Sequence, residues 1–118
     1  MSYLDVYIGD LDDPSFDWEG GDWSGKLPVR QSNFFPAGNQ DFKTLVARIQ
    51  SGRYDGKQVD WGGWVARLFP SEIMSFLDEQ YTPLKLKRCG CKKQVDSIRQ
   101  YILKLDPNKK YALVASEF

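Results

Sequence analysis

The residues with the clearest chemical potential are six carboxylates near the start of the chain: Asp10, Asp12, Asp13, Asp17, Glu19 and Asp22. Paired carboxylates perform glycosidase-type chemistry when one of them is buried and stays protonated. These acids lie in a Gly-rich polar segment, where we expect solvated, ionised side chains. An EF-hand is excluded, because Pro14 stands at the fifth position of such a loop, Ser15 replaces its glycine and Gly21 its final glutamate. An oxygen site of another kind for calcium stays a minor alternative.

The other side chains suited to catalysis are scarce. The chain has no histidine, which excludes Ser-His-Asp triads, Cys-His pairs and His-containing zinc sites built from this chain alone. It also lacks the phosphate-loop and dinucleotide-binding glycine motifs. Cys89 and Cys91 are flanked by Arg88, Lys92 and Lys93, and basic neighbours favour the reactive thiolate. Two thiols are too few for structural zinc, so we interpret them as free thiols in a basic loop, with oxidation or a metal shared across a dimer as alternatives. We predict no enzyme activity and no cofactor.

All four tryptophans lie in two short stretches that also contain Asp and Gly, DWEGGDW at 17–23 and DWGGW at 60–64. Trp64 leads into an apolar run and is expected in the core, whereas Trp61 is ambiguous. Trp18 and Trp23 are flanked by acids and belong to no apolar periodicity. Tryptophan often packs over the end of a sheet, and it is also a favoured hot-spot residue of protein interfaces. The pattern therefore allows both packing and partner binding.

Charge is segregated along the sequence although the formal net charge is zero. Residues 1–25 carry seven acids and no base, while residues 83–110 carry nine bases against two acids. A zero net charge lacks the basic footprint of a nucleic-acid binder. The segregation is consistent with two faces for different partners, or with two segments that attract each other within one molecule.

Acids beside tryptophans suit a basic protein partner, because complementary charge speeds encounter and buried aromatic rings hold a complex. We therefore predict a non-catalytic interaction module that inhibits a macromolecule such as a nuclease or a nucleic-acid-binding complex. Its partner-binding residues would be Asp17, Trp18, Glu19, Asp22, Trp23 and Trp61. One alternative is a nucleic-acid module that uses the basic segment 85–93. Another is a small-ligand or metal-binding domain.

The elements that position these residues follow from periodicity and turn signals. Strict alternation predicts a strand at 3–9, and Pro28 limits a short strand at 27–33 to an edge. A helix follows at 39–51, with Asn39 as its N-cap and Gly52 as its left-handed end. Next come a turn at 53–58, a strand at 63–69, a helix at 72–81 capped by Ser71, and a basic connection. A helix at 92–105 and a closing central strand at 110–118 complete the order.

These elements predict one α+β domain over residues 1–118, with a small mixed or antiparallel sheet and about three helices. The N-terminus lacks the features of a signal peptide, and no apolar run is long enough to span a membrane. We therefore expect a cytoplasmic protein. A homo-oligomer is compatible with the sequence. The run WGGWVARLFPSEIMSFLDEQY, the helix after it and the final YALVASEF resemble small α+β proteins of the bacterial immunity type, found beside toxins or in mobile elements. The resemblance covers roughly the last half of the chain and implies an inhibitor without assigning its site.

Overall fold

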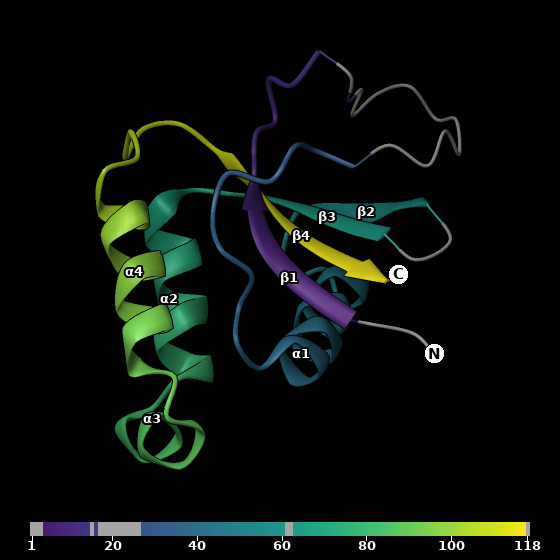
Figure 1. Ribbon diagram of the computed structural model, residues 1–118. Helices are drawn as coiled ribbons and strands as arrows, with labels where there is room; N and C mark the ends of the chain where they lie inside the picture. Colours follow the sequence, from purple (N-terminus) through teal and green to yellow (C-terminus); the bar gives the residue numbers. More distant parts are fainter. Residues whose placement is uncertain (1–3, 15, 17–26, 61–62, 118) are drawn as a thin grey trace.

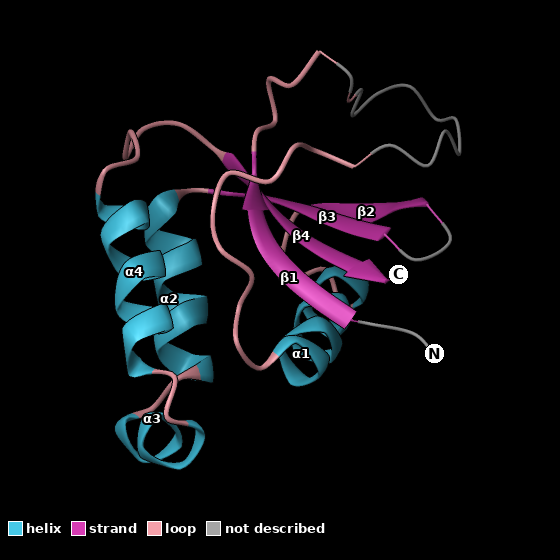
Figure 2. Cartoon of the chain, viewed as in Figure 1, coloured by secondary structure: helices cyan, strands magenta, loops and turns pink. Residues whose placement is uncertain are grey.

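One sheet and the helices packed on it form an α+β fold, as the sequence predicts (Figure 1 and Figure 2). The computed structural model describes residues 4–14, 16, 27–60 and 63–117. Within them the strands are β1 (Leu4–Gly9), β2 (Gly56–Asp60), β3 (Gly63–Leu68) and β4 (Tyr111–Glu117). The helices are α1 (Gly38–Gln50), α2 (Pro70–Gln80), α3 (Pro83–Cys89) and α4 (Lys92–Leu103).

The sheet has the strand order β1-β4-β3-β2, and every neighbouring pair is antiparallel. β4 therefore lies between β1 and β3, which confirms the central place predicted for the closing strand. Its Val114 is aligned with Tyr7 on one side and Val65 on the other. β1 and β3 match the predicted strands at 3–9 and 63–69 to within one residue at an end.

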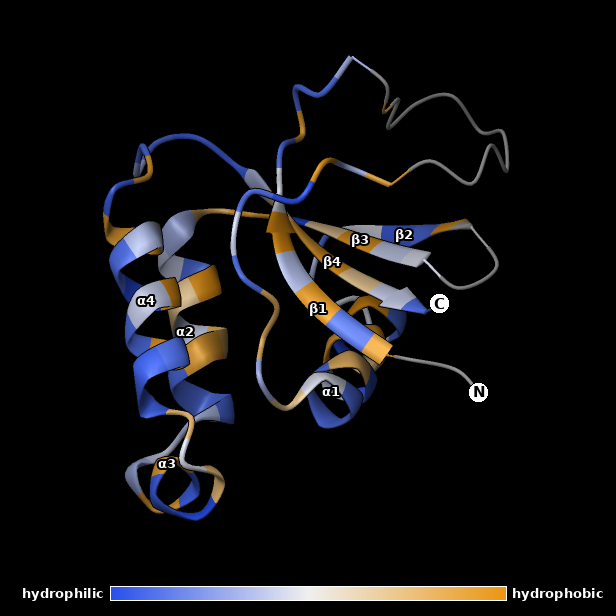
Figure 3. Ribbon diagram, in the orientation of Figure 1, coloured by the Kyte–Doolittle hydropathy of each residue, from blue (hydrophilic) through white to orange (hydrophobic). Residues whose placement is uncertain are grey.

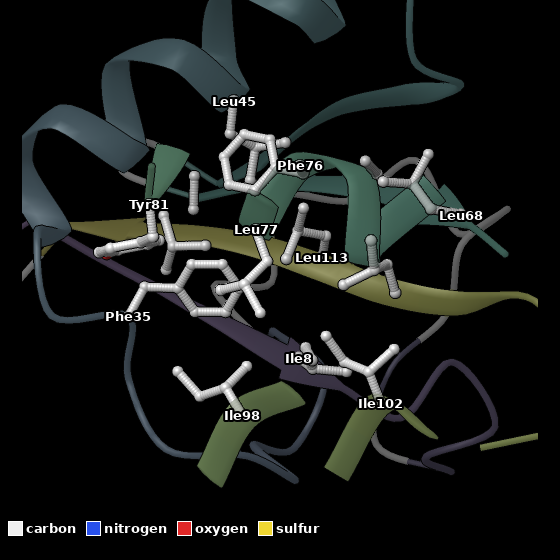
Figure 4. Packing of buried hydrophobic residues seen from close by; sticks show 14 of the residues in the cluster. Ile8, Phe35, Leu45, Leu68, Phe76, Leu77, Tyr81, Ile98, Ile102 and Leu113 are labelled. Atoms are coloured by element: carbon white, nitrogen blue, oxygen red, sulfur yellow. The ribbon is translucent and has the colours of Figure 1, made fainter. Parts of the chain in front are cut away.

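Alternation along the strands sends apolar side chains to both faces of the sheet. On one face, Ile8 and Leu113 join the main core, to which α1, α2 and α4 each contribute buried side chains. Phe35 and Phe76 lie in this core with ring centroids 6.0 Å apart (Figure 4). The apolar side of α2 is turned toward the sheet, as the hydropathy colouring of Figure 3 shows.

The other face of the sheet is covered by the long connection between β1 and α1. Tyr7, Val65 and Val114 point to this face and form a second cluster with the buried side chain of Phe16. Leu27 is partly buried against the same cluster. The sheet thus has helices on one side and an irregular chain segment on the other, and both sides are apolar.

The end of this connection also runs along the free edge of β1. Backbone N–H groups of Gln31 and Phe35 donate to carbonyls of β1 at 2.8 Å. The strand predicted at 27–33 is reduced to a single bridge between Gly9 and Arg30. Pro28 has no N–H to donate, and the Ser32 hydroxyl, not a carbonyl, accepts the Ile8 N–H at 3.0 Å. These two residues interrupt the ladder.

Two of the three helix-end predictions were wrong. α1 begins at Gly38 with Ala37 as N-cap, two residues before the predicted Asn39 cap. α2 begins at Pro70, not after Ser71, because proline fits the first helical position, where no N–H partner is needed. The Glu72 carboxylate then accepts the N–H of the N-cap residue at 3.1 Å. Gly52 ends α1 with φ +82°, as predicted.

Two elements were absent from the sequence-based prediction. The basic connection contains α3, a seven-residue helix whose first N–H groups are capped by the Thr82 hydroxyl, which accepts from Lys85 at 3.3 Å. The turn predicted at 53–58 gives way at Gly56 to β2, which pairs with β3 as a hairpin. An alanine Cβ at Gly56 would lie 2.6 Å from the Val65 carbonyl oxygen, so this glycine allows close strand approach.

Candidate functional site

The predicted partner-binding residues Asp17, Trp18, Glu19, Asp22, Trp23 and Trp61 all lie outside the described residues. What the structure does describe is the chain on either side of them, at Phe16 and Leu27 and at Gly63. Trp64, which was expected in the core, is half-buried and packs against the main cluster from β3. The site is therefore built from the positions at which the two tryptophan-bearing stretches leave the described fold.

Both described ends of the 17–26 stretch lie on the same face of the sheet. Phe16 is 8% exposed and belongs to the second apolar cluster, and Leu27 packs partly buried against it. Their apolar side chains hold these ends against the sheet by hydrophobic burial. The acidic, tryptophan-bearing stretch is thus attached at both ends to a rigid surface.

The second stretch leaves the fold beside the first. A Cβ placed on Gly63 would lie 2.6 Å from Leu27 Cδ2, so the start of β3 is in direct contact with the Leu27 side chain. Residues 61–62 precede Gly63 in the β2–β3 connection, and residues 17–26 precede Leu27. The fold therefore brings Leu27 and Gly63 into contact although they are more than thirty positions apart in the sequence.

The acidic segment is tied down by Asp13, which the sequence had suggested would be solvated. Its side chain is buried at 7% exposure, and Oδ2 accepts the Val29 N–H at 3.0 Å. Nearby, the Tyr7 hydroxyl donates to the Pro28 carbonyl at 2.9 Å. Burial raises the Tyr7 pKa to about 12, with the Arg30 charge opposing and the Asp13 charge adding to the rise. Asp13 is therefore a structural anchor of the loop.

One described ion pair joins the acidic segment to the basic segment. The ammonium of Lys109 lies 2.5 Å from Asp12 Oδ2, and both side chains are substantially exposed. The basic residues of the 85–93 segment lie elsewhere, on α3 and at the start of α4. In Figure 1, α3 lies at the far end of the molecule from residues 10–14 and 27–30. The bases of α3 are thus far from the described acids Asp10, Asp12 and Asp13.

The basic end, which we call the α3 tip, consists of α3 and the first turn of α4. Its exposed cations are Lys87, Arg88, Lys92 and Lys93. Lys92 pairs with Asp96 at 3.4 Å, and no described carboxylate pairs with the other three. Lys85 instead turns toward α1, donating to the Gln40 side chain at 2.8 Å. The α3 tip is accordingly a positively charged surface.

Cys89 and Cys91 lie on the α3 tip and are joined in a disulfide, which corrects the prediction of two free thiols. Gly90 between them adopts φ +64°, a left-handed conformation that brings the two cysteine Cα atoms to 5.2 Å. That separation lies within the range that a disulfide spans. The sequence shows the one-residue spacing of the two cysteines, but it gives no sign that the backbone turns at Gly90.

A buried carboxylate that sequence reasoning missed links α1 to the end of α2. Asp41 is fully buried, and its Oδ2 accepts a hydrogen bond from the Tyr81 hydroxyl. That hydroxyl in turn accepts the Ala37 N–H at 2.8 Å. Burial raises the Asp41 pKa to about 6, against the lowering effects of the Tyr81 hydrogen bond and the Lys85 charge. Burial and the Asp41 contact raise the Tyr81 pKa well above its ordinary value.

The Asp41–Tyr81 pair connects positions 40 apart in the sequence, so no local motif could reveal it. Each group is engaged by the other, and the second carboxylate oxygen has no hydrogen-bond partner among the described residues. We interpret the pair as a structural connection between helices. Because the Asp41 pKa is raised on folding, the contribution of this pair to the stability of the protein depends on pH.

A polar hollow of about 340 Å³ lies between α4 and the segment that runs along the free edge of β1. It is lined by Arg30, Gln31, Ser32, Asn33, Ser97 and Tyr101. Asn33 and Ser97 meet across it at 3.5 Å. Burial, with the Tyr111 and Asp10 charges adding to it, raises the Tyr101 pKa. The lining offers hydrogen-bonding groups without a carboxylate or thiol.

Comparison of the chain with family models, curated proteins and solved structures finds no match. Over the described residues there is no group of three or more Cys, Asp or Glu side chains placed to hold a metal ion. None of the described helices is both long and apolar enough to cross a lipid bilayer. The chemistry of the site therefore rests on the geometry of this chain alone.

Proposed function

We propose that the protein is a non-catalytic interaction module that binds a basic macromolecular partner and inhibits it by occlusion. The contact surface would comprise Asp17, Trp18, Glu19, Asp22, Trp23 and Trp61, as the sequence analysis predicts. The observation that supports this surface is the contact between Leu27 and Gly63. This contact joins a residue that follows the first tryptophan-bearing stretch to a residue of the second, which supports a shared surface without describing it.

In this proposal the tryptophans and the carboxylates contribute differently to binding. Hot spots of protein interfaces are enriched in Trp, and a few such residues supply most of the binding energy. Carboxylates around them steer a basic partner and fix its orientation. The stretch 17–23 combines two tryptophans with three acids and no base. An immunity protein or a phage anti-defence inhibitor requires such a surface and no reaction chemistry.

The test compares wild-type protein with a Trp18→Ala/Trp23→Ala variant in capture from lysate of the native host, read by mass spectrometry. We expect one basic protein to be retained by the wild type and lost by the double variant. A Lys87→Gln/Arg88→Gln variant, altered on the α3 tip, is the matched control and should retain the same protein. Purified partner then allows the Kd of each variant to be measured.

Folding of the double variant is checked by circular dichroism and urea unfolding before any capture. If it unfolds, the two tryptophans are core residues and the proposed surface is wrong. If it folds and retains the same protein as the wild type, the partner binds elsewhere. If a purified candidate partner keeps its activity when saturated with this protein, occlusion is wrong even though binding is right.

One observation favours a second candidate function, nucleic-acid binding through the α3 tip. Lys87, Arg88 and Lys93 are exposed together there, and a cluster of cations is what neutralises backbone phosphates. The segment has no aromatic residue interleaved among its bases for stacking. Affinity for DNA or RNA that falls steeply with salt would support this candidate, and absence of binding at low salt would exclude it.

A further inference from the structure

The Cys89–Cys91 disulfide differs from structural disulfides in its position. It bridges the last residue of α3 and the residue that precedes α4, so only Gly90 lies between the cysteines. The stabilising effect of a disulfide on the fold grows with the length of the loop that it closes. A bridge over one residue restrains the unfolded chain very little, so fold stability is a poor explanation for it.

The two sulfurs have unequal environments. Cys89 is an exposed residue, whereas Cys91 is 4% exposed and contributes to the main core. An incoming thiolate therefore reaches Cys89, and the Cys91 sulfur is the one that must leave. Attack on one defined sulfur, with the other as leaving group, is the geometry of thiol–disulfide exchange.

The surroundings stabilise the sulfur anions that reduction produces. Cys91 is the N-cap of α4, whose first turn has neither a capping side chain nor an acidic residue, so the open N–H groups there favour a thiolate. The Cys89 sulfur accepts the backbone N–H of Cys91 at 3.2 Å. Arg88 and Lys93 are neighbours of the pair in sequence and are exposed on the α3 tip. Their positive charge also attracts an anionic thiol.

We propose that Cys89 and Cys91 form a thiol–disulfide exchange site, with Cys89 as the attacked sulfur and small anionic thiols such as glutathione as its reductants. This site shares no residue with the proposed partner-binding surface. The first thiolate attacks Cys89 Sγ; a bond forms between the two sulfurs, the Cys89–Cys91 bond breaks, and Cys91 leaves as a thiolate. A second thiolate then attacks the glutathione sulfur of the mixed disulfide, which releases Cys89 as a thiolate. Two thiols are oxidised to one disulfide, and the protein disulfide gains two electrons.

The first experiment incubates the oxidised full-length protein with a series of mixtures of reduced and oxidised glutathione, followed by acid quenching, alkylation and mass spectrometry. We expect the pair to pass from oxidised to reduced within the range of ratios used for cytoplasmic redox buffers, while the protein stays folded by circular dichroism. A pair that remains oxidised at every ratio in the folded protein, and opens only in urea, would show a buried structural disulfide and overturn the proposal.

The second experiment locates the attacked sulfur and the charge effect. With oxidised glutathione, the Cys91→Ser variant should form a mixed disulfide at Cys89 roughly tenfold faster or more than Cys89→Ser forms one at Cys91. Reduction of wild-type protein by glutathione should slow roughly threefold in Lys92→Gln/Lys93→Gln at low ionic strength, with no difference at high salt. Reduction by the uncharged thiol 2-mercaptoethanol should be unchanged.

A Lys43→Gln/Lys104→Gln variant loses the same charge at exposed positions away from the cysteines and is the matched control. Equal slowing in both double variants would mean that net charge, and not the α3 tip, sets the rate. Equal adduct formation in the two cysteine variants would refute Cys89 as the attacked sulfur. Failure of these outcomes leaves the partner-binding proposal untouched, because that proposal is tested by capture with variants of Trp18 and Trp23.

Discussion

Replacement of Asp41 by Asn should change how the stability of the protein depends on pH. Asp41 is fully buried, and burial raises its pKa from 3.8 to about 6 in the folded protein. A group whose pKa is raised on folding holds its proton more tightly in the folded state. Its favourable contribution is complete below about pH 4 and is lost as the pH rises through about 6. The carboxylate at neutral pH therefore costs stability that the protonated acid does not.

The size of this cost follows from the pKa difference of about 2 units. Each unit corresponds to about 1.4 kcal/mol, so ionisation of Asp41 lowers the free energy of unfolding by at most about 3 kcal/mol between pH 4 and neutral pH. Asparagine keeps the oxygen that accepts from Tyr81 and carries no charge. Its amide N–H₂ would replace the oxygen without a partner, at a cost of about 1–3 kcal/mol. The change in the free energy of unfolding with pH therefore reports the ionisation of Asp41 more directly than the free energy at a single pH.

The assay is urea unfolding of wild type and Asp41→Asn at a series of pH values from about 4 to 8, with the difference in free energy of unfolding plotted against pH. Subtraction removes the titration of the other acids, which both proteins share. The wild type should lose up to about 3 kcal/mol relative to the variant across the window, and most of the change should fall between about pH 4 and 6. Lys85→Gln removes a charge that opposes the rise and should shift the midpoint upward. A flat difference curve would refute the argument, because it would show that Asp41 ionises as easily in the folded protein as in the unfolded chain.

Three further substitutions test the packing of the fold by urea unfolding. Gly38→Ala should destabilise by about 1–3 kcal/mol, because the new Cβ would lie 2.3 Å from the backbone oxygen of Leu4, which has to move; unchanged stability would show that β1 and α1 are less closely packed. Phe76→Ala should cost about 3–5 kcal/mol, since the ring is fully buried in the main core, and a loss below 1 kcal/mol would contradict that burial. Lys109→Gln should leave the unfolding midpoint nearly unchanged, because its pairing with Asp12 is a solvent-exposed ion pair, and a large loss would mean that this contact holds the acidic segment in place.

The regular parts of this fold could be predicted from local pattern. Alternation gave β1, the apolar run gave β3 and β4, and helical spacing gave α1, α2 and α4, because burial on one or two faces imposes those periods. α3 was missed since seven residues are too few to show a helical period, although Thr82 as N-cap and Pro83 as first helical residue are a start signal. β2 was missed because Asp55-Gly56 indicates a turn, and the turn ends one residue earlier than the glycine suggests.

What local pattern could not supply is contact between distant residues. Asp41 stands in the first turn of α1, where an acid suits the helix dipole, and only the fold places the Tyr81 hydroxyl against it. Asp13 looked like one of several solvated acids until the chain folded back to bring the Val29 N–H to it. In both cases the residue type was noticed and its environment was not, because burial of a single carboxylate depends on a partner with no fixed sequence spacing.

The arrangement of charge follows from the same distinction. The sequence shows acids in one segment and bases in another, which fits either mutual attraction or separate faces. Among the described residues, the sheet stands between Leu11, Phe16 and Leu27 on one face and the helices on the other. The Asp12–Lys109 pair is possible only because Lys109 lies in the connection from α4 back to β4, which returns to the end of β1. The bases of the α3 tip make no such return, so their charge faces solvent at the opposite end and is available to anionic molecules. A protein with zero net charge thus carries a positively charged surface at the α3 tip, because no described acid folds back onto its exposed cations other than Asp96.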